Sequence, residues 1–103
     1  VCITVNEPVL IDSCVIIPKA HKETPFDFTQ EEWLATKDLL DKIKMYLDEK
    51  CSPDGYNLGW NIGRVAGQTV FHSHLHVIPR HNNEPYAGFG FRHWLKMKEN
   101  KRP

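Results

Sequence analysis

Alternating hydrophobic and polar residues predict three strands in this chain. Residues 9–17 form an apolar, β-branched run that ends at Pro18, which is typical of a strand. Residues 56–63 alternate with a period of two, as the side chains of a half-buried strand do. Residues 69–78 show the same alternation up to Pro79, where we expect the strand to end.

A long helix is predicted between the first two of these strands. Thr29 and Glu32 have the spacing of a capping box, so we expect the helix to begin there and to run to about Lys50. Hydrophobic residues recur along it at helical intervals and form one stripe, made of Trp33, Leu40, Ile43 and Leu47. A helix that packs such a stripe on one face of an antiparallel sheet gives an α+β domain.

The size and charge of the chain narrow the class of protein. Its 103 residues fit one domain over residues 1–103, with a tail from about residue 85. Thirteen Lys and Arg balance thirteen Asp and Glu, so net charge attracts the chain to neither nucleic acid nor a membrane. The tail alone is basic, and we expect it to be a solvated end; its basic residues are Arg92, His93, Lys96, Lys98, Lys101 and Arg102.

The cysteines and the hydropathy of the chain predict its compartment. Three cysteines without a C-x-x-C pair indicate free thiols rather than a disulfide framework or a zinc clip. No apolar run approaches the roughly twenty residues of a membrane span. We therefore expect a cytoplasmic protein that binds neither membrane nor nucleic acid.

Three histidines in the stretch "QTVFHSHLHVIPR" are the main candidates for chemistry. His72, His74 and His76 occupy every second position of the third predicted strand, so they share one of its faces with Val70 and Ile78. The residues between them face the other way and are mostly apolar, as expected of the side that the helix covers: Phe71, Ser73, Leu75 and Val77. The histidine face is then the working face of the sheet.

Three interpretations of this row remain open. Three imidazoles on an unpacked face are hard to explain as satisfied core residues. A metal site needs them to converge on one ion, yet successive side chains on one strand face lie nearly 7 Å apart, which is awkward for three ligands. The third interpretation is nucleophilic catalysis, because a neutral imidazole near pH 7 can attack an electrophilic phosphorus while its neighbours bind the phosphate oxygens. That reaction requires neither a metal nor a cofactor.

Residues beside the row fit the catalytic interpretation. Asn61 and Gln68 carry amides that can hold phosphate oxygens, and Thr69 adds a hydroxyl at the start of the predicted strand. Gly63 and Gly67 allow a close approach of the backbone. Each of these residue types is also common in turns or strands, so the argument depends on the whole cluster.

The stretch "GYNLGWNIGRVAGQTVFHSHLHVIPR" resembles the histidine triad (HIT) superfamily of nucleotide hydrolases and transferases. "VIIPKAH" is similar to the upstream strand of that family and "PFDFTQEEW" to its helix entry, so the resemblance covers roughly residues 9–80. It is nearest to the branch of dinucleoside polyphosphate hydrolases and nucleotide-binding phosphoramidases. The resemblance implies that His74 is the nucleophile, and that His72 and His76 orient it and contact phosphate oxygens.

The resemblance also implies a fold, a partner and a binding pocket. Family members have a five-stranded antiparallel sheet with a long helix, and they commonly form homodimers. Asn61, Gln68 and Thr69 stand where members bind the α-phosphate and assist the leaving group. The nucleoside pocket is expected near residues 9–17, with Asp12 as the candidate for the acidic residue that binds ribose. Ser13 stands where many members carry a fourth histidine.

Two functions of different classes follow from these residues. The first is a metal-independent hydrolase that cleaves a nucleoside phosphoramidate or a dinucleoside polyphosphate through a nucleotidyl intermediate on His74 and releases a nucleoside monophosphate. The alternative is a nucleotide-binding or signalling module that uses the same cleft without turnover. The presence of all three histidines favours the enzyme, because a binding module has little need of the central one.

Overall fold

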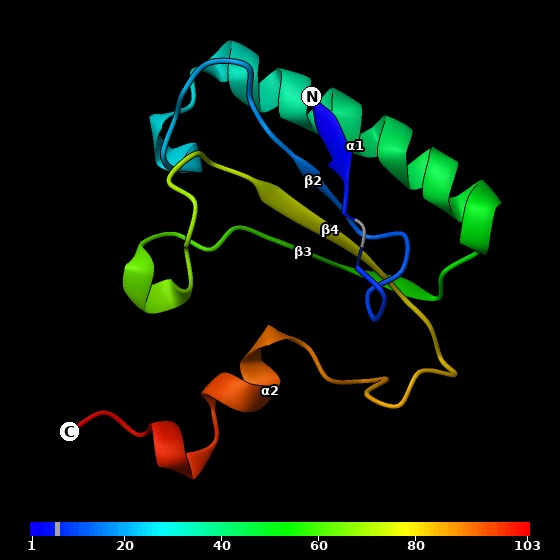
Figure 1. Ribbon diagram of the computed structural model, residues 1–103, viewed down its shortest axis with the longest axis vertical. Coiled ribbons are helices and arrows are strands. Elements are labelled where there is room, and N and C mark those ends of the chain that lie inside the picture. The colour runs from blue at the N-terminus through cyan, green and yellow to red at the C-terminus, as the bar shows by residue number, and fades with distance from the viewer. Residues whose placement is uncertain (6) are drawn as a thin grey trace.

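The protein is a two-layer α+β fold in which one long helix covers one face of a small antiparallel sheet (Figure 1). The computed structural model describes residues 1–5 and 7–103. Its strands are β1 (Cys2–Thr4), β2 (Cys14–Ile16), β3 (Gly55–Gly59) and β4 (Leu75–Arg80). Its helices are α1 (Gln30–Cys51) and α2 (Phe91–Leu95), with short 3₁₀ turns at Pro25–Asp27, Arg64–Ala66 and Lys98–Asn100.

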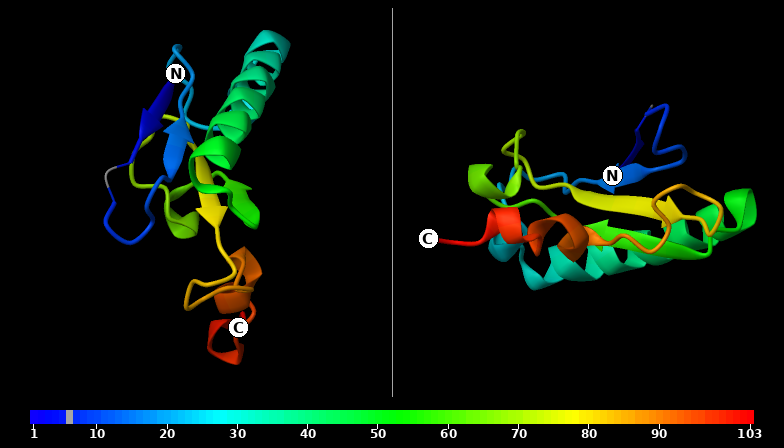
Figure 2. Two further views of the ribbon diagram at one scale, coloured as in Figure 1. Left: turned by 90° about the vertical axis from the view of Figure 1, so that its right-hand side faces the viewer. Right: turned by 90° about the horizontal axis from the view of Figure 1, so that it is seen from below.

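The sheet confirms the predicted fold class and places β4 in the interior. The strand order is β1-β2-β4-β3, and every neighbouring pair is antiparallel. The described part of the chain contributes four strands, where five were expected. The strand β1 was not predicted; it pairs with β2 from Cys2 opposite Ile16 to Thr4 opposite Cys14. Figure 2 shows the sheet and α1 as two layers, and Figure 1 shows α2 on the β3 side of the sheet.

The first predicted strand is much shorter than its sequence indicated. Only Cys14–Ile16 of residues 9–17 is a strand. Asp12 has a φ of 67°, in the left-handed region, and the backbone N–H of Ser13 donates to the carbonyl of Leu10. These residues therefore form a turn that returns the chain from β1 to β2.

The third predicted strand is displaced toward the C-terminus. It begins at Leu75 rather than at residue 69, and it continues through Pro79 to Arg80. Proline is tolerated there because β2 pairs with β4 only from Leu75 to Val77, so Pro79 has a neighbouring strand on the β3 side alone. The expectation that proline ends this strand is wrong for that reason. The strand β3 is likewise shorter than residues 56–63.

The helix α1 forms as the sequence predicts. The Thr29 side chain accepts from the backbone N–H of Glu32, and the Glu32 carboxylate accepts from the backbone N–H of Thr29, so the capping box is complete. The helix ends at Ser52, which adopts the left-handed conformation with a φ of 46°. None of the helices in the described residues is both long and apolar enough to cross a bilayer.

The core lies entirely between α1 and one face of the sheet. Its buried residues are Cys14 and Ile16 of β2, Ile43 and Leu47 of α1, and Leu75 and Val77 of β4. Half-buried Leu39, Leu40, Tyr56 and Trp60 pack against this cluster. The opposite face of the sheet is therefore left for other roles, and the histidines lie on it.

Candidate active site

The three histidines line the face of the chain that α1 does not cover. From residue 72 to residue 80, odd-numbered side chains are buried and even-numbered ones are half-buried. Ser73, Leu75 and Val77 are only 1 to 3% exposed, because they point toward the helix. This alternation confirms that the histidines share one face, although only His76 lies within β4 itself.

The segment that carries His72 and His74 is extended without being a strand. It runs beside the loop that follows β2, and the backbone N–H of Ser73 donates to the carbonyl of Lys22 at 2.6 Å. His72 Nε2 lies 3.0 Å from the carbonyl oxygen of Pro18 in the same loop. A carbonyl oxygen only accepts, so Nε2 of His72 carries a proton. The loop thereby fixes both the backbone and the ring of His72.

His74 is held in one tautomer by its own backbone neighbourhood. Its Nδ1 lies 3.0 Å from the carbonyl oxygen of His72 and must donate to it. In the neutral ring the second nitrogen, Nε2, then keeps its lone pair. A hydrogen bond that protonates one ring nitrogen and frees the other is what a nucleophilic or general-base histidine requires.

His76 contacts the central histidine, and its ring is half-buried. The ring centroids of His74 and His76 are 4.8 Å apart, in an edge-to-face arrangement of 68°. Burial, followed by the charge of His74, lowers the pKa of His76 from its ordinary value of 6.5. Its Nε2 is buried and has no hydrogen-bond partner among the described residues. His76 is therefore neutral at pH 7.

A fourth histidine, His21, joins the row through the loop after β2. Its ring lies edge-to-face against His72, with centroids 5.1 Å apart. His21 lies outside the predicted strand of the triad, and the sequence alone did not connect it to the other three histidines. Ser13, at the position expected of a fourth histidine, is buried, and its hydroxyl donates to the carbonyl of Leu10 at 2.8 Å.

Gln68 is buried and holds the loop that precedes the histidines. Its amide oxygen accepts from the backbone N–H of Gly63, and its amide nitrogen donates to the carbonyls of Glu23 and Val70. The φ of Gly63 is 84°, a backbone conformation that favours glycine. The Gln68 side chain thus positions this loop against the chain that follows β2.

Asn61 and Thr69 are exposed, in contrast to Gln68. A Cβ built on Gly67 would lie 3.6 Å from Nδ2 of Asn61, so the amide of Asn61 lies next to the backbone of this loop. Gly67 has a φ of 97°, which glycine adopts without strain. Both polar side chains remain available to a ligand on the loop that leads into the histidine row.

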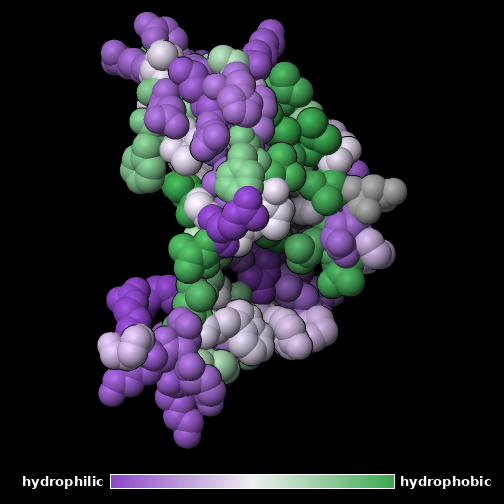
Figure 3. All heavy atoms as spheres, turned by 60° about the vertical axis from the view of Figure 1, so that its left-hand side comes forward, coloured by the Kyte–Doolittle hydropathy of each residue, from purple (hydrophilic) through white to green (hydrophobic). Residues whose placement is uncertain are grey.

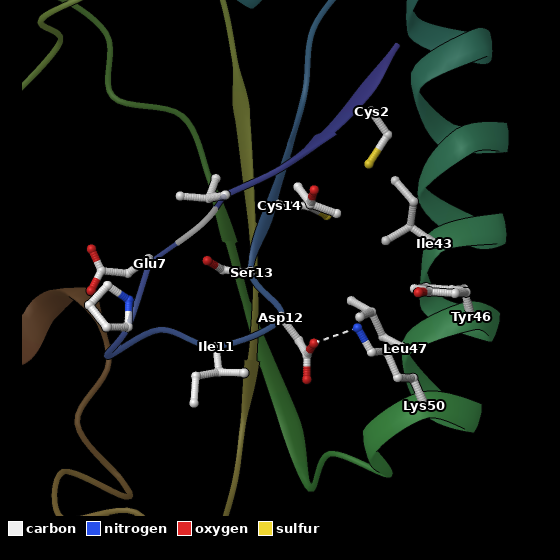
Figure 4. Close-up of a pocket in the computed structure, with 13 residues that line it drawn as sticks. Cys2, Glu7, Ile11, Asp12, Ser13, Cys14, Ile43, Tyr46, Leu47 and Lys50 are labelled. Carbon is white, nitrogen blue, oxygen red and sulfur yellow. Dashed lines mark ion pairs between the residues drawn. The ribbon is translucent and has the colours of Figure 1, made fainter.

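Asp12 lies at a cavity that none of the three histidines lines. It forms an ion pair with Lys50 at 2.8 Å and borders a cavity of about 490 Å³ between the β1–β2 hairpin and α1 (Figure 4). The apolar lining of this cavity includes Cys14, Ile43 and Leu47, which belong to the helix side of the sheet. The structure therefore does not bring Asp12 together with the triad.

No three metal-binding side chains lie close enough to hold an ion within residues 1–5 and 7–103. The histidine row is extended, and the hydrogen bonds of His72 and His74 direct one nitrogen of each ring to the backbone. The arrangement is better suited to a row of contacts along a phosphate chain than to one shared ion.

The family model of the HIT domain matches residues 2–83, which include every element from β1 to β4. The chain belongs to the HIT domain family. An adenosine 5'-monophosphoramidase of Schizosaccharomyces pombe is 34% identical over 77 residues, which are 75% of this chain and 55% of that protein. The chain spans 51 to 64% of the length of three further curated relatives that it matches.

Solved HIT structures share this fold. The crystal structure of a HIT family protein from Bacillus anthracis is 36% identical, with a TM-score of 0.73 over 80% of this chain and 58% of that one. A diadenosine triphosphate hydrolase from Plasmodium falciparum, solved in complex with cyclomarin A, is 27% identical. Its TM-score is 0.68 over 81% of this chain and 56% of that one.

Within the HIT fold, the sequence failed to identify two features of this site. The spacing of residues along the chain did not relate His21 to the triad. Its contact with His72 forms only because the fold places the loop after β2 beside the histidine row. Phe91, from α2, lies against Gly59 of β3, the cross-strand partner of His76. Neither contact leaves a signal in the spacing of residues along the chain.

Proposed function

We propose that this HIT domain is a nucleotide hydrolase that transfers a nucleoside monophosphoryl group to His74 and then to water. The observation that carries the proposal is the hydrogen bond between Nδ1 of His74 and the carbonyl of His72. It leaves Nε2 with a free lone pair on the open face of the sheet. The names of a phosphoramidase relative and a diadenosine triphosphate hydrolase support the same reaction class.

The reaction proceeds in two displacements at one phosphorus. Nε2 of His74 attacks the α-phosphorus, a P–N bond to the ring forms, and the bond to the leaving group breaks with its electron pair on that group, which takes a proton from solvent when it leaves as an amine. Water then attacks the same phosphorus, its proton passes to solvent, and the bond to Nε2 breaks. The products are a nucleoside monophosphate and a regenerated neutral imidazole.

The neighbouring residues take separate parts in this proposal. His72 and His76 flank the nucleophile and contact the phosphate oxygens, while Asn61 and Thr69 bind the substrate from the adjoining loop. Gln68 acts by holding that loop, since its amide is already bonded to Gly63, Glu23 and Val70. A nucleotide is the only small molecule required, and the proposal includes no metal or cofactor.

The alternative function is nucleotide binding without turnover. It predicts that adenosine monophosphate binds but that no phosphoramidate or polyphosphate is consumed. A metal site is a further alternative, which exhaustive chelation separates from the proposal: turnover that persists without metal excludes it. Both alternatives would leave the central histidine unmodified during incubation with substrate.

Replacement of His74 tests the proposal directly. The amide of asparagine resembles one edge of the imidazole ring in shape but is not a nucleophile. We therefore expect His74→Asn to reduce kcat by at least about 10³-fold. Adenosine monophosphate should still bind, which calorimetry measures. Mass spectrometry of wild-type protein quenched during turnover should find the nucleotidyl group on His74.

His81→Asn is the matched control, because His81 lies beyond the end of β4 and outside the row. It should retain wild-type turnover. Full activity of His74→Asn, or an adduct on another residue, would contradict the proposed mechanism.

We further propose that the chain acts as a single-domain homodimer in the cytoplasm. Both edge strands of the sheet, β1 and β3, offer backbone groups for pairing, and a small core gains stability from a partner surface. Light scattering coupled to size-exclusion chromatography checks the dimer; a monomer at micromolar concentration would exclude it.

A further inference from the structure

The C-terminal segment, residues 91–103, is attached at its base and exposed along the rest of its length. Figure 3 shows it as a largely hydrophilic lobe set off from the body of the molecule. At the base, the ring centroids of Phe89 and His93 are 3.7 Å apart in a stacked arrangement, and Arg80 donates to the carbonyl of Phe89 at 2.7 Å. Every residue of the segment except His93 is exposed. Its other side chains are therefore available to a partner.

The charges of the protein are divided between this segment and the rest of the chain. The segment contains five Lys and Arg against one Glu, whereas residues 1–90 contain eight Lys and Arg against twelve Asp and Glu. The segment thus carries a net charge of +4 and the rest of the chain −4, which the total of zero conceals. Every ion pair among the described residues joins two residues before position 85. The cations of the segment are left unpaired within that part of the chain.

Apolar side chains are exposed among these cations. Phe91, Trp94 and Leu95 have the i, i+3, i+4 spacing that places them on one side of α2. They are 56, 52 and 66% exposed, and Met97 beyond the helix is 41% exposed. Apolar and aromatic side chains on one side, with Lys and Arg around them, are typical of segments that lie in the interface of a bilayer.

One cavity of about 620 Å³ combines both kinds of side chain. Leu95 and Met97 contribute its apolar lining. The amide of Asn100 donates to the carbonyl of Leu95 at 2.7 Å and closes the turn around it. Four cations line the cavity, and such groups bind phosphate through charge-assisted hydrogen bonds: Lys96, Lys98, Lys101 and Arg102. The cavity therefore suits a group in which a phosphate is joined to an apolar chain.

We propose that the C-terminal segment binds the surface of a bilayer that contains anionic phospholipids. Its cations contact the phosphate headgroups, while Trp94 and Leu95 enter the interface. The negative charge of residues 1–90 keeps the rest of the protein away from the same surface. The contact is peripheral and requires no membrane-spanning helix. It departs from the expectation based on total charge, because total charge does not reveal how the charges are distributed.

The aliphatic side chains favour a lipid surface over a single-stranded nucleic acid. A nucleic acid would use the cations, and its bases would stack on Trp94. It offers no comparable contact to Leu95 and Met97, which have no planar surface for stacking. At a bilayer both aliphatic side chains leave water together with the aromatic ring.

Sedimentation with vesicles tests the proposal on the full chain. We expect the protein to sediment with vesicles of phosphatidylcholine and phosphatidylserine in equal parts, and not with vesicles of phosphatidylcholine alone. The bound fraction should fall when the ionic strength is raised from about 0.1 M to about 1 M, because the screening length shortens from about 10 Å to about 3 Å.

A triple variant tests the cations. Lys96→Gln/Lys98→Gln/Lys101→Gln should lower the partition coefficient on the anionic vesicles by about 100-fold, at roughly fivefold for each charge removed near the surface. The matched control removes three exposed cations from α1 and changes the total charge equally: Lys37→Gln/Lys42→Gln/Lys44→Gln. It should keep most of the binding. An equal loss in both variants would show that total charge governs binding, and the proposal would be overturned.

Leu95→Ala tests the apolar contact. We expect it to lower the partition coefficient by about 5- to 50-fold, since three buried carbons are lost. Leu34→Ala is the matched control, because Leu34 lies on α1 and is 60% exposed. It should bind as the wild type does. Unchanged binding of Leu95→Ala would show that the segment does not enter the interface.

The remaining outcomes identify other occupants of the segment. Equal binding to neutral and anionic vesicles, or binding to neither, overturns the proposal. Binding of a single-stranded oligonucleotide without vesicle binding would assign the segment to nucleic acid. Self-association without vesicles that the triple variant abolishes would assign it to a second copy of the chain. None of these measurements uses turnover, so they leave the hydrolase proposal untouched, and circular dichroism shows that each variant is folded.

Discussion

The two faces of β4 and of the segment before it differ in burial and in the residues that they carry. Toward α1, Leu75 and Val77 are almost fully buried and join the core. Toward the open side, His74 and His76 remain half-buried, and Nε2 of His76 has no hydrogen-bond partner among the described residues. Because successive side chains of a strand point to opposite faces, one short segment both contributes to the core and carries the histidines. Packing fixes the register of the backbone, and the register fixes the row of imidazoles.

The largest contrast between the faces should come from Leu75 and its neighbour His76. Leu75→Ala removes a side chain that is 3% exposed from the core and leaves a cavity. We expect the free energy of unfolding to fall by about 2–5 kcal/mol. Urea unfolding followed by tryptophan fluorescence measures this loss, and turnover per folded molecule should be nearly unchanged.

His76→Ala is the complementary variant on the opposite face. It should cost much less stability and most of the activity. If Leu75→Ala instead abolished turnover in fully folded protein, the division of labour between the faces would be disproved.

The parts of the fold that the sequence predicted are those that local contacts determine. The capping box at Thr29 involves residues three apart, and the alternation through the histidines involves residues two apart. Both patterns act within one element, so they are readable without knowing what packs against it. The fold class followed from them.

The parts that the sequence did not predict depend on contacts between distant residues. The late start of β4 follows from the bond between Ser73 and Lys22, and the turn at Asp12 from the pairing of β1 with β2. The pairing of β1 with β2 also explains why Asp12 lies away from the triad. The contact between Phe91 and Gly59 joins residues that are 32 positions apart, and it leaves no periodic signal.

An intermediate effect is expected at Ser73, the polar exception on the helix face. Ser73 is 2% exposed, and its hydroxyl has no hydrogen-bond partner among the described residues. Burial of an unpaired hydroxyl is unfavourable, so Ser73→Ala should raise the free energy of unfolding by about 1 kcal/mol. The backbone bond to Lys22 is unaffected by this change.

Thermal or urea unfolding measures the gain at Ser73. Ser13→Ala serves as the control, because the hydroxyl of buried Ser13 does donate to Leu10 and its removal should destabilise the protein. Destabilisation by both substitutions would mean that the hydroxyl of Ser73 has a hydrogen-bond partner in solution, such as a buried water molecule between the sheet and α1.

The smallest effect we expect is a pH dependence of stability that arises on the histidine face. Burial and the charge of His74 hold the pKa of His76 below 6.5 in the folded protein, while the unfolded chain keeps the ordinary value. Between these two values the unfolded state binds a proton that the folded state does not. Stability is therefore unaffected above about pH 6.5 and falls as the pH decreases toward the lowered pKa.

In His76→Asn this contribution disappears, so the free energy of unfolding should depend less on pH than in the wild type. Denaturant titrations at successive pH values measure the difference, and the two curves should run parallel between about pH 7.5 and 8.5, where the imidazole is neutral in both states. A steeper acid loss in the variant would show that His76 is protonated when folded, and that the open face holds a charged rather than a neutral imidazole beside His74.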